Sequence, residues 1–314
     1  MKLRITAVLL IIFGFIFFIE SCNNSKSNGD SEDVKVKEVV DKQLNITILL
    51  DLSDRIDLSK KYNGIYKKNN QKDRDLKIVK NIVDFFKNDM ITKGAYNAKG
   101  KIKVLFSPIP SNSDINTIAS NLIIDCSDKS IPEKKEILNT ILGKFEENLS
   151  DIYDISIKKS TYIGSDIWRF FKDEVKQKCI EKDSSYRNIL VLVTDGYIYH
   201  KNSTEIIEKR SMYLLPKLIE KEKINLVGNS EIVKDRIRKY DYGYISTGNN
   251  FKNLEVLVTE ILPIPSRLDD KYIIEEYLKK WFNDMGIMNN NFEIFNSELP
   301  AYTKEKVLDF FNND

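Results

Sequence analysis

Two nearly continuous apolar runs dominate the hydrophobic pattern of this 314-residue chain. Residues 46–50 lead directly into Asp51, and residues 189–193 lead directly into Thr194 and Asp195. Apolar runs of this length, rich in aliphatic and β-branched residues, are typical of strands buried on both faces of a parallel sheet. We therefore predict two central strands whose carboxyl ends deliver acidic side chains to one shared polar site.

Further strands and helices alternate along the chain. The spacing of apolar residues predicts helices over residues 76–90, 132–145, 163–180, 212–219, 231–240 and 254–262. Shorter apolar runs predict strands over residues 101–108, 121–125, 224–227 and 242–246. This alternation predicts an α/β fold, a doubly wound and mostly parallel sheet with helices on both faces.

A C-terminal helical appendage is predicted beyond Pro263 and Pro265. Residues 272–285 and 303–311 have apolar positions at helical spacing. The apolar stripe around Trp281 offers a docking face for a partner helix, but stripes of this kind more often pack on their own domain. We therefore expect this helix to pack on the parent domain.

The first 21 residues have the pattern of an export signal. Lys2 and Arg4 precede an apolar segment, residues 9–19, which is shorter than the roughly 20 residues of a membrane-spanning helix. The following Ile19-Glu20-Ser21-Cys22 resembles the lipobox of bacterial lipoproteins, with Glu20 as a departure from the pattern. The resemblance implies cleavage before Cys22 and attachment of lipid such as palmitate to that cysteine. The alternative is an uncleaved N-terminal anchor helix.

A linker separates this signal from the globular part. Asn, Ser, Asp, Glu and Lys make up most of residues 23–42, and such a composition is typical of a solvated segment. If flexible, about 20 residues would hold the domain on the order of 25 Å from the bilayer. Asn23 rather than Asp after the cysteine favours the outer membrane of a Gram-negative cell envelope. The predicted organisation is a signal peptide at 1–21, a linker at 22–43, a domain at 44–265 and a C-terminal extension at 266–314.

The charge of the chain excludes one class of partner. Loss of residues 1–21 removes two basic side chains and one acidic side chain, which leaves a net charge of +1. This balance gives no electrostatic footprint for nucleic acid. The apolar content of 42% supports one large domain with an appendage. Cys126 and Cys179 remain after lipidation, and an exported pair is compatible with a disulfide or with two buried thiols.

Three short motifs resemble the von Willebrand factor type A (vWA) family: Asp51-Leu52-Ser53, Thr161-Tyr162-Ile163-Gly164 and Thr194-Asp195-Gly196. Their order matches the metal-ion-dependent adhesion site of that family, and the resemblance covers residues 44–265. It implies Asp51, Ser53, Thr161 and Asp195 as metal ligands. Their oxygen donors suit Mg²⁺ or Mn²⁺. The resemblance also implies that an acidic side chain of a protein partner completes the shell of the ion.

Arg55 departs from this motif, because it stands where the family has a second serine. A guanidinium cannot ligate a cation and is always charged. If Arg55 points into the crevice, it is expected to pair with Asp51 and Asp195 and to replace the ion. If it points outward, Asp54 or a water molecule is expected to fill the position.

The function that this pattern favours is protein binding by a membrane-anchored envelope lipoprotein, not catalysis. The only histidine, His200, is expected in an exposed loop, and no Gly-x-Ser-x-Gly elbow is present. One alternative is a metal-dependent hydrolase that uses Asp51 and Asp195. Another is a structural envelope lipoprotein in which the site has no function.

Overall fold

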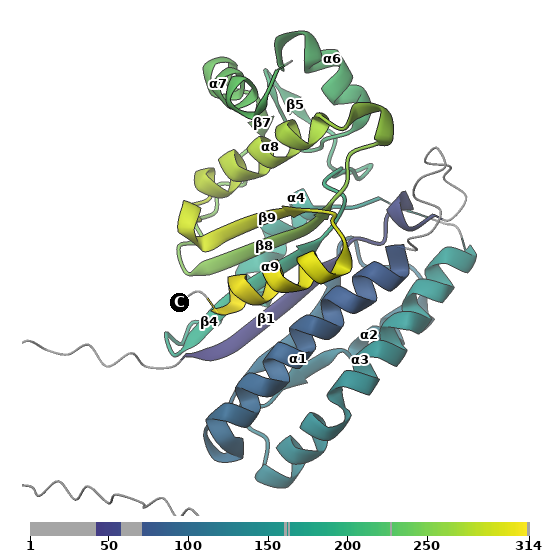
Figure 1. Ribbon diagram of the computed structural model, residues 1–314, viewed down its shortest axis with the longest axis vertical. Helices are drawn as coiled ribbons and strands as arrows, with labels where there is room; N and C mark the ends of the chain where they lie inside the picture. The colour runs from purple at the N-terminus through teal and green to yellow at the C-terminus, as the bar shows by residue number, and fades with distance from the viewer. Residues whose placement is uncertain (1–41, 58–70, 160–161, 163, 227, 313–314) are drawn as a thin grey trace, which may run out of the picture. The chain divides into compact units, whose positions relative to one another are not determined.

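A six-stranded sheet forms the centre of the molecule, in the strand order β3-β2-β1-β4-β8-β9 (Figure 1). The computed structural model describes residues 42–57, 71–159, 162, 164–226 and 228–312, all within one compact unit, Val40–Asp314. The strands are β1 (Gln43–Leu50), β2 (Lys101–Phe106), β3 (Ile123–Asp125), β4 (Tyr186–Val193), β8 (Leu254–Ile261) and β9 (Phe292–Asn296). Neighbouring strands are parallel, except that β3 pairs antiparallel with β2 at one edge.

The two predicted central strands, β1 and β4, lie side by side in the middle of the sheet. Every residue of β4 is buried, and so is every residue of β1 after Gln43. A side-chain hydrogen bond also links the two strands, since Asn45 Nδ2 donates to Asn188 Oδ1 at 2.7 Å. The prediction that both strands are covered on both faces is therefore confirmed.

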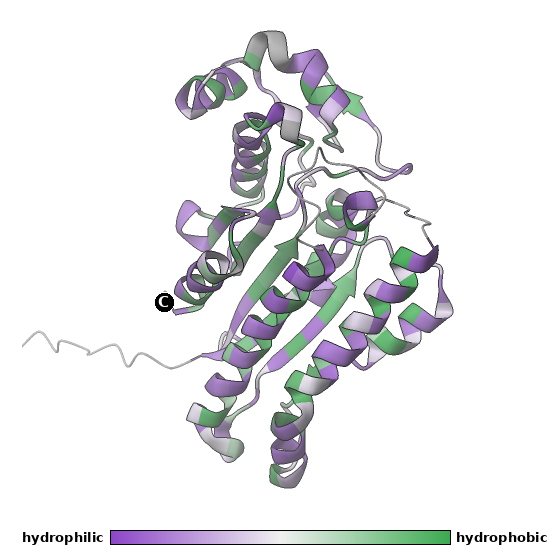
Figure 2. Cartoon of the chain, turned by 45° about the vertical axis from the view of Figure 1, so that its right-hand side comes forward, coloured by the Kyte–Doolittle hydropathy of each residue, from purple (hydrophilic) through white to green (hydrophobic). Residues whose placement is uncertain are grey.

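Helices cover both faces of the sheet, and each layer has its own apolar core. The first core contains side chains of α1 (Gln71–Asn97), α2 (Ser113–Ser120), α3 (Ile131–Lys159) and α9 (Pro300–Asn312). The second contains side chains of α4 (Ile167–Arg169), the π turn η2 (Phe170–Glu174), α5 (Val175–Lys178), α6 (Pro216–Leu226), α7 (Ser230–Tyr240) and α8 (Asp270–Asp284). Figure 2 shows predominantly hydrophobic central strands between helices of mixed hydropathy. The fold is a doubly wound α/β fold, as the sequence predicts.

Short elements complete the chain. A second sheet has the order β5-β6-β7 and consists of β5 (Ile206–Ile207), β6 (Arg210–Ser211) and β7 (Gly243–Tyr244). Single turns of 3₁₀ helix are η1 (Asp54–Ile56), η3 (Pro265–Arg267) and η4 (Asn289–Asn291). η1 follows β1 directly and so lies at the carboxyl edge of the main sheet.

Two predicted elements have the wrong type. Residues 254–262 are predicted to be helical and instead form β8, whereas residues 224–226, in a predicted strand, belong to α6. Both runs are short and apolar, and periodicity does not separate a buried strand from a buried helix at this length. Three helix starts differ from the prediction by four residues or more, and the first of these is α1, which begins at Gln71 rather than at residue 76. α6 begins at Pro216 rather than at residue 212. Proline suits the first position of a helix, because a backbone N–H there would have no acceptor within the helix. The helix expected from residue 163 begins at Ile167.

The C-terminal segment is part of the sheet and of both covering layers. β9 pairs in parallel with β8 as the sixth strand, and Trp281 of α8 is fully buried in the second core. Phe311 of α9 lies against Phe85 of α1, with the ring centroids 4.9 Å apart. The expected helical extension at residues 266–314 thus contains a strand and belongs to the main domain rather than forming an appendage.

Cys126 and Cys179 are both buried, free thiols. They belong to opposite cores, one on each face of the sheet. The alternative of two buried thiols therefore holds, and a disulfide between them does not form in this fold. Among helices within the described ranges, none combines the length and apolar character that crossing a bilayer requires.

Replacement of Phe311 by alanine tests whether α9 belongs to the core. We expect Phe311→Ala to lower the free energy of unfolding by about 3 kcal/mol, because it removes a buried ring and leaves a cavity. Tyr302→Ala on the same helix is the matched control, because Tyr302 is 57% exposed, and we expect its effect to stay within about 0.5 kcal/mol. Urea denaturation measures both. Equal effects of the two substitutions would show that α9 is not part of the core.

Candidate functional site

The strand order creates a switch point between β1 and β4. From β1 the chain proceeds to β2 on one side, while β4 lies on the other side. Asp51 follows β1, and Asp195 lies two residues beyond the end of β4. The backbones join here, because Asp51 N donates to the carbonyl of Val193 at 3.1 Å. Open α/β sheets bind their ligands outside the carboxyl ends of the strands at such a point.

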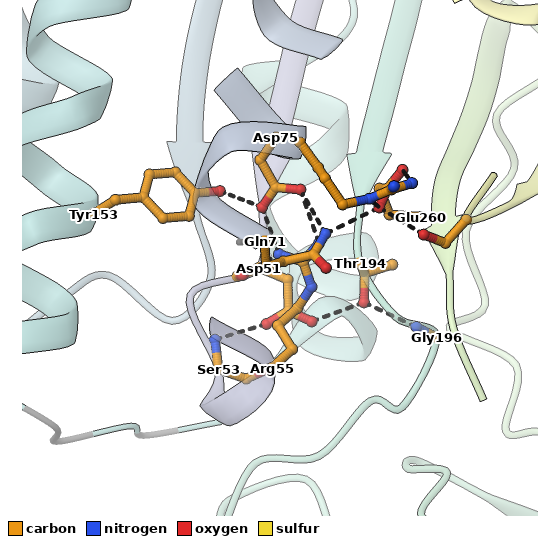
Figure 3. Close-up of polar contacts among 11 residues, drawn as sticks. Asp51, Ser53, Arg55, Gln71, Asp75, Tyr153, Thr194, Gly196 and Glu260 are labelled. Atoms are coloured by element: carbon orange, nitrogen blue, oxygen red, sulfur yellow. Dashed lines mark hydrogen bonds and ion pairs between the residues drawn. The ribbon is translucent and has the colours of Figure 1, made fainter. Parts of the chain in front are cut away.

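Asp51 ties the two strand ends together. Its carboxylate is buried, with the residue only 3% exposed. Oδ1 accepts a hydrogen bond from Ser53 N at 2.8 Å, and Oδ2 accepts one from Thr194 Oγ1 at 2.7 Å (Figure 3). Thr194 Oγ1 in turn accepts from Gly196 N at 3.2 Å. Asp51 therefore fixes both the turn after β1 and the turn after β4.

Asp195 faces a cleft at the same edge. Ser53, Asp54 and Asp195 line this cleft, which has a volume of about 780 Å³. Asp195 is half-buried, and its Oδ1 accepts from Tyr197 N at 3.0 Å. Burial raises the pKa of Asp195 to about 7, the negative charge of Asp51 adds to this, and Arg55 opposes it. Two acidic side chains therefore lie close enough at this edge to interact, and of the two only Asp195 lines the cleft.

The glycine after Asp195 is required by the turn. Gly196 has a φ of +90°, a conformation that side chains with a Cβ rarely adopt. A Cβ at this position would lie 2.5 Å from Ile274 Cγ2. The glycine of Thr194-Asp195-Gly196 is therefore required by the sharp turn of the chain after β4, where it passes close to α8.

Arg55 pairs with an acid that no sequence motif singles out. Its Nη1 and Nη2 lie 2.7 and 3.1 Å from the two carboxylate oxygens of Asp75 on α1, and Nη1 also donates to the Asp51 carbonyl at 3.2 Å. Tyr153 of α3 donates to Asp75 Oδ2 at 2.5 Å. Arg55 therefore neither replaces an ion between Asp51 and Asp195 nor points outward. Both expected orientations are wrong, because a buried carboxylate on α1 holds the guanidinium beneath the cleft.

This buried pair is part of a longer polar network (Figure 3). Gln71 Nε2 donates to Asp75 Oδ1 and to Glu260 Oε2, both at 3.0 Å. Arg74 Nε and Nη2 donate to the two oxygens of Glu260 at 2.6 and 2.8 Å, and Ser297 Oγ donates to the same carboxylate at 2.9 Å. The network joins the first turn of α1 to the ends of β8 and β9.

Glu260 occupies an unusual backbone position in β8. Its φ is +72°, and the pairing of β8 with β9 shifts register between Val258 and Ile261. A non-glycine residue in this region is strained and persists only when its surroundings hold it. The contacts of its carboxylate with Arg74, Gln71 and Ser297 provide that hold.

The remaining predicted site residues have mixed outcomes. Thr161 and Cys22 lie outside the residues that the structure describes. Gly164 of the second motif lines the cleft with a φ of +90°, and a Cβ at this position would lie 2.2 Å from the Tyr199 carbonyl oxygen. The expectation that His200 is exposed is wrong, since the residue is only 7% exposed. Its Nδ1 lies 3.0 Å from Asp166 Oδ2.

The site residues that no sequence motif predicts are Gln71, Arg74, Asp75, Tyr153 and Glu260. Arg74 and Glu260 are 186 residues apart in the chain. Each of these polar residues is isolated within its own segment, and no short motif connects them. A buried charge in a helix or strand is detectable only once its partner is known.

The donors on the cleft floor fit a hard divalent cation. Ser53 offers a hydroxyl and Asp195 a carboxylate. Asp51 does not line the cleft, and its carboxylate accepts the hydrogen bonds that position the two turns. Burial and the charge of Asp51 raise the pKa of Asp195, and a bound cation would favour its ionised form. In the parts of the chain described, no group of three or more His, Cys, Asp or Glu side chains is placed to hold a metal. An ion here would therefore depend on hydroxyl and water ligands as well.

Comparisons with known proteins find distantly similar structures but do not assign the chain to a family. No family model matches the chain, and no curated protein matches it. One similar structure is proximal thread matrix protein 1 of the mussel byssus, with a TM-score of 0.36 and 11% identity over 87% of this chain and 48% of that chain. Another is the pilus adhesin SpaC from Lactobacillus rhamnosus GG, with a TM-score of 0.37 and 12% identity over 87% of this chain and 30% of that chain. The chain thus spans less than half the length of either protein.

The pair of Arg55 and Asp75 makes a strong prediction for stability. Asp75→Asn leaves a buried guanidinium without an opposite charge, so we expect a loss of about 3–5 kcal/mol in the free energy of unfolding. Asp84→Asn on the exposed side of α1 is the control, with an expected change within about 0.5 kcal/mol. Urea denaturation followed by circular dichroism compares them. A loss below about 1 kcal/mol for Asp75→Asn would contradict the importance of the pair.

Proposed function

We propose that this chain is a lipid-anchored envelope protein that binds another protein through a metal-dependent site at the carboxyl ends of β1 and β4. The observation that carries the proposal is that Ser53 and Asp195 line one cleft at the switch point while Arg55 is held beneath it by Asp75. The cleft floor therefore offers oxygen donors and negative charge to a cation. The resemblance of the three motifs to the vWA family supports the same interpretation.

Within this proposal, the residues have distinct tasks. Ser53 and Asp195 would hold Mg²⁺ or Mn²⁺, together with Thr161 as the resemblance implies. Asp51 would stand behind them, because its hydrogen bonds to Ser53 N and Thr194 Oγ1 position the ligand-bearing turns. The bound ion would supply Lewis acidity to which a carboxylate of the partner protein binds.

Binding suits the site better than catalysis. Asp51, the acid that a hydrolase would need as a nucleophile or base, is buried and already accepts hydrogen bonds at both oxygens. His200 lies against Asp166 and is not among the residues that line the cleft. The proposal therefore assigns no reaction to these residues and treats them as a recognition site.

The location of the protein is part of the proposal. Residues 19–22 resemble a lipobox, and residues 23–42 have the composition of a solvated tether. A lipid on Cys22 would hold the folded domain close to the membrane surface, where the cleft meets partners in the envelope. With Asn23 next to the cysteine, we place it in the outer membrane when the cell is Gram-negative.

Metal binding is the direct test of the site. We expect the full-length chain in detergent to bind Mg²⁺ and Mn²⁺ with micromolar to millimolar affinity in titration calorimetry. Asp195→Ala removes a ligand and should abolish this binding, whereas Asp173→Ala removes an exposed carboxylate elsewhere and should leave it unchanged. Equal heats for the wild type and Asp195→Ala would refute the metal site.

Lipidation is tested separately at Cys22. In a Gram-negative host fed radiolabelled palmitate, we expect the wild-type chain to carry label and to sediment with outer-membrane vesicles. Cys22→Ala should carry no label, because it lacks the thiol, and Cys126→Ala is the control that should keep the label. A wild-type chain that carries no label and yet stays in the membrane would instead indicate an uncleaved anchor helix at residues 1–21.

A further inference from the structure

The cleft extends beyond the acidic floor to the start of α6. Leu215, Pro216 and Ile264 give this part of the lining an apolar surface. Tyr197 also lines the cleft, and its hydroxyl accepts from Ile264 N at 3.3 Å, which fixes the aromatic ring. A volume of about 780 Å³ is large enough for several side chains of a bound segment. The apolar lining therefore offers room for more than the single carboxylate that would reach a metal ion.

Two lysines of the same cleft have no acidic partner among the residues that the structure describes. Lys201 and Lys217 line it and are exposed, and neither forms an ion pair with any residue that the structure describes. Lys217 belongs to the first turn of α6, and this turn contains no acidic residue. The N-terminus of a helix carries a partial positive charge that favours anions. Asp54 and Asp195 are the acidic residues of the same lining. Once a cation offsets this acidic floor, the two lysines and the helix N-terminus make the other part of the cleft attractive to anions.

A buried hydroxyl in the cleft is also without a hydrogen-bond partner in the described part of the chain. Ser165 lines the cleft and is only 1% exposed, and within the described ranges its Oγ makes no hydrogen bond. Its backbone is fixed, because Ser165 N donates to the Tyr199 carbonyl at 2.7 Å. A buried polar group without a partner is unfavourable. An oxygen acceptor from a ligand, or a water molecule held by one, would satisfy it.

We propose that the cleft recognises a short protein segment with two carboxylates on either side of an apolar side chain. This inference rests on the proposed function, because the first carboxylate binds at the ion held by Asp195 and Ser53. The apolar side chain packs on the surface around Pro216. The second carboxylate binds Lys201, Lys217 and the N-terminus of α6. Ser165 adds a hydroxyl donor at the floor.

A selection experiment identifies the preferred segment. A phage-displayed library of random dodecamers is panned against the full-length chain in detergent with Mg²⁺ present. We expect the enriched peptides to share two acidic residues separated by an apolar residue, because charge complementarity determines which sequences bind. Enrichment of basic or purely apolar peptides, or no enrichment at all, would overturn the proposal.

Charge reversal then tests the second subsite. An enriched peptide, made synthetically with a fluorophore, is titrated by anisotropy. We expect the double variant Lys201→Glu/Lys217→Glu to weaken its binding about tenfold or more, because attraction becomes repulsion. The double variant Lys135→Glu/Lys304→Glu changes the net charge equally at exposed positions on α3 and α9 and should bind as the wild type does. Ser165→Ala should weaken binding by a smaller factor and leave Mg²⁺ affinity unchanged.

The two levels of the proposal fail in different ways. If EDTA and Asp195→Ala abolish peptide binding while the Lys201 and Lys217 variant binds normally, the second subsite is refuted and the metal-dependent function stands. If the lysine variant loses binding but EDTA and Asp195→Ala have no effect, the metal-dependent function is refuted. Replacing the second acidic residue of the peptide by its amide should produce the same loss as the lysine variant, and an unchanged affinity would overturn the two-carboxylate proposal.

Discussion

The buried ion pair between Arg55 and Asp75 is the interaction on which the site depends. It joins the turn after β1 to α1, and Tyr153 extends the link to α3. Removing two charges from water is costly, so such a pair persists only with good geometry and further hydrogen bonds. The two-pronged contact, the Tyr153 hydroxyl and the Gln71 amide provide both. The result is a guanidinium fixed below the cleft.

The same network explains why the C-terminal segment is integral to the fold. Glu260 takes a strained backbone conformation at the end of β8 and is held by Arg74 and Gln71 from α1 and by Ser297 after β9. Arg74 also donates to the Glu298 carbonyl at 2.6 Å. Polar contacts therefore fix the carboxyl edge of the sheet, while apolar contacts fix its faces. A site at this edge gains a rigid support from segments distant in sequence.

The cleft itself combines two electrostatic regions. Its floor carries acidic oxygens, and burial together with the charge of Asp51 raises the pKa of Asp195. Its other part carries Lys201, Lys217 and the N-terminus of α6. The protein supplies no partner of opposite charge for these lysines among the described residues, so both regions are available to ligands. In the interaction that we propose, a cation on the floor and an acidic segment across the cleft would satisfy the two regions together.

The sequence by itself determined the class of fold and the position of Asp51 and Asp195 at strand ends. Both are visible in the local sequence, because a strand buried on both faces needs continuous apolar residues and the acids follow directly after these runs. Only the tertiary structure decided that residues 254–262 form a strand, since a short apolar run fits either element. It alone decided where Arg55 points, because the energy of a buried charge depends on a partner brought near by folding. The local pattern thus fixed where the acids lie, and long-range contacts fixed what surrounds them.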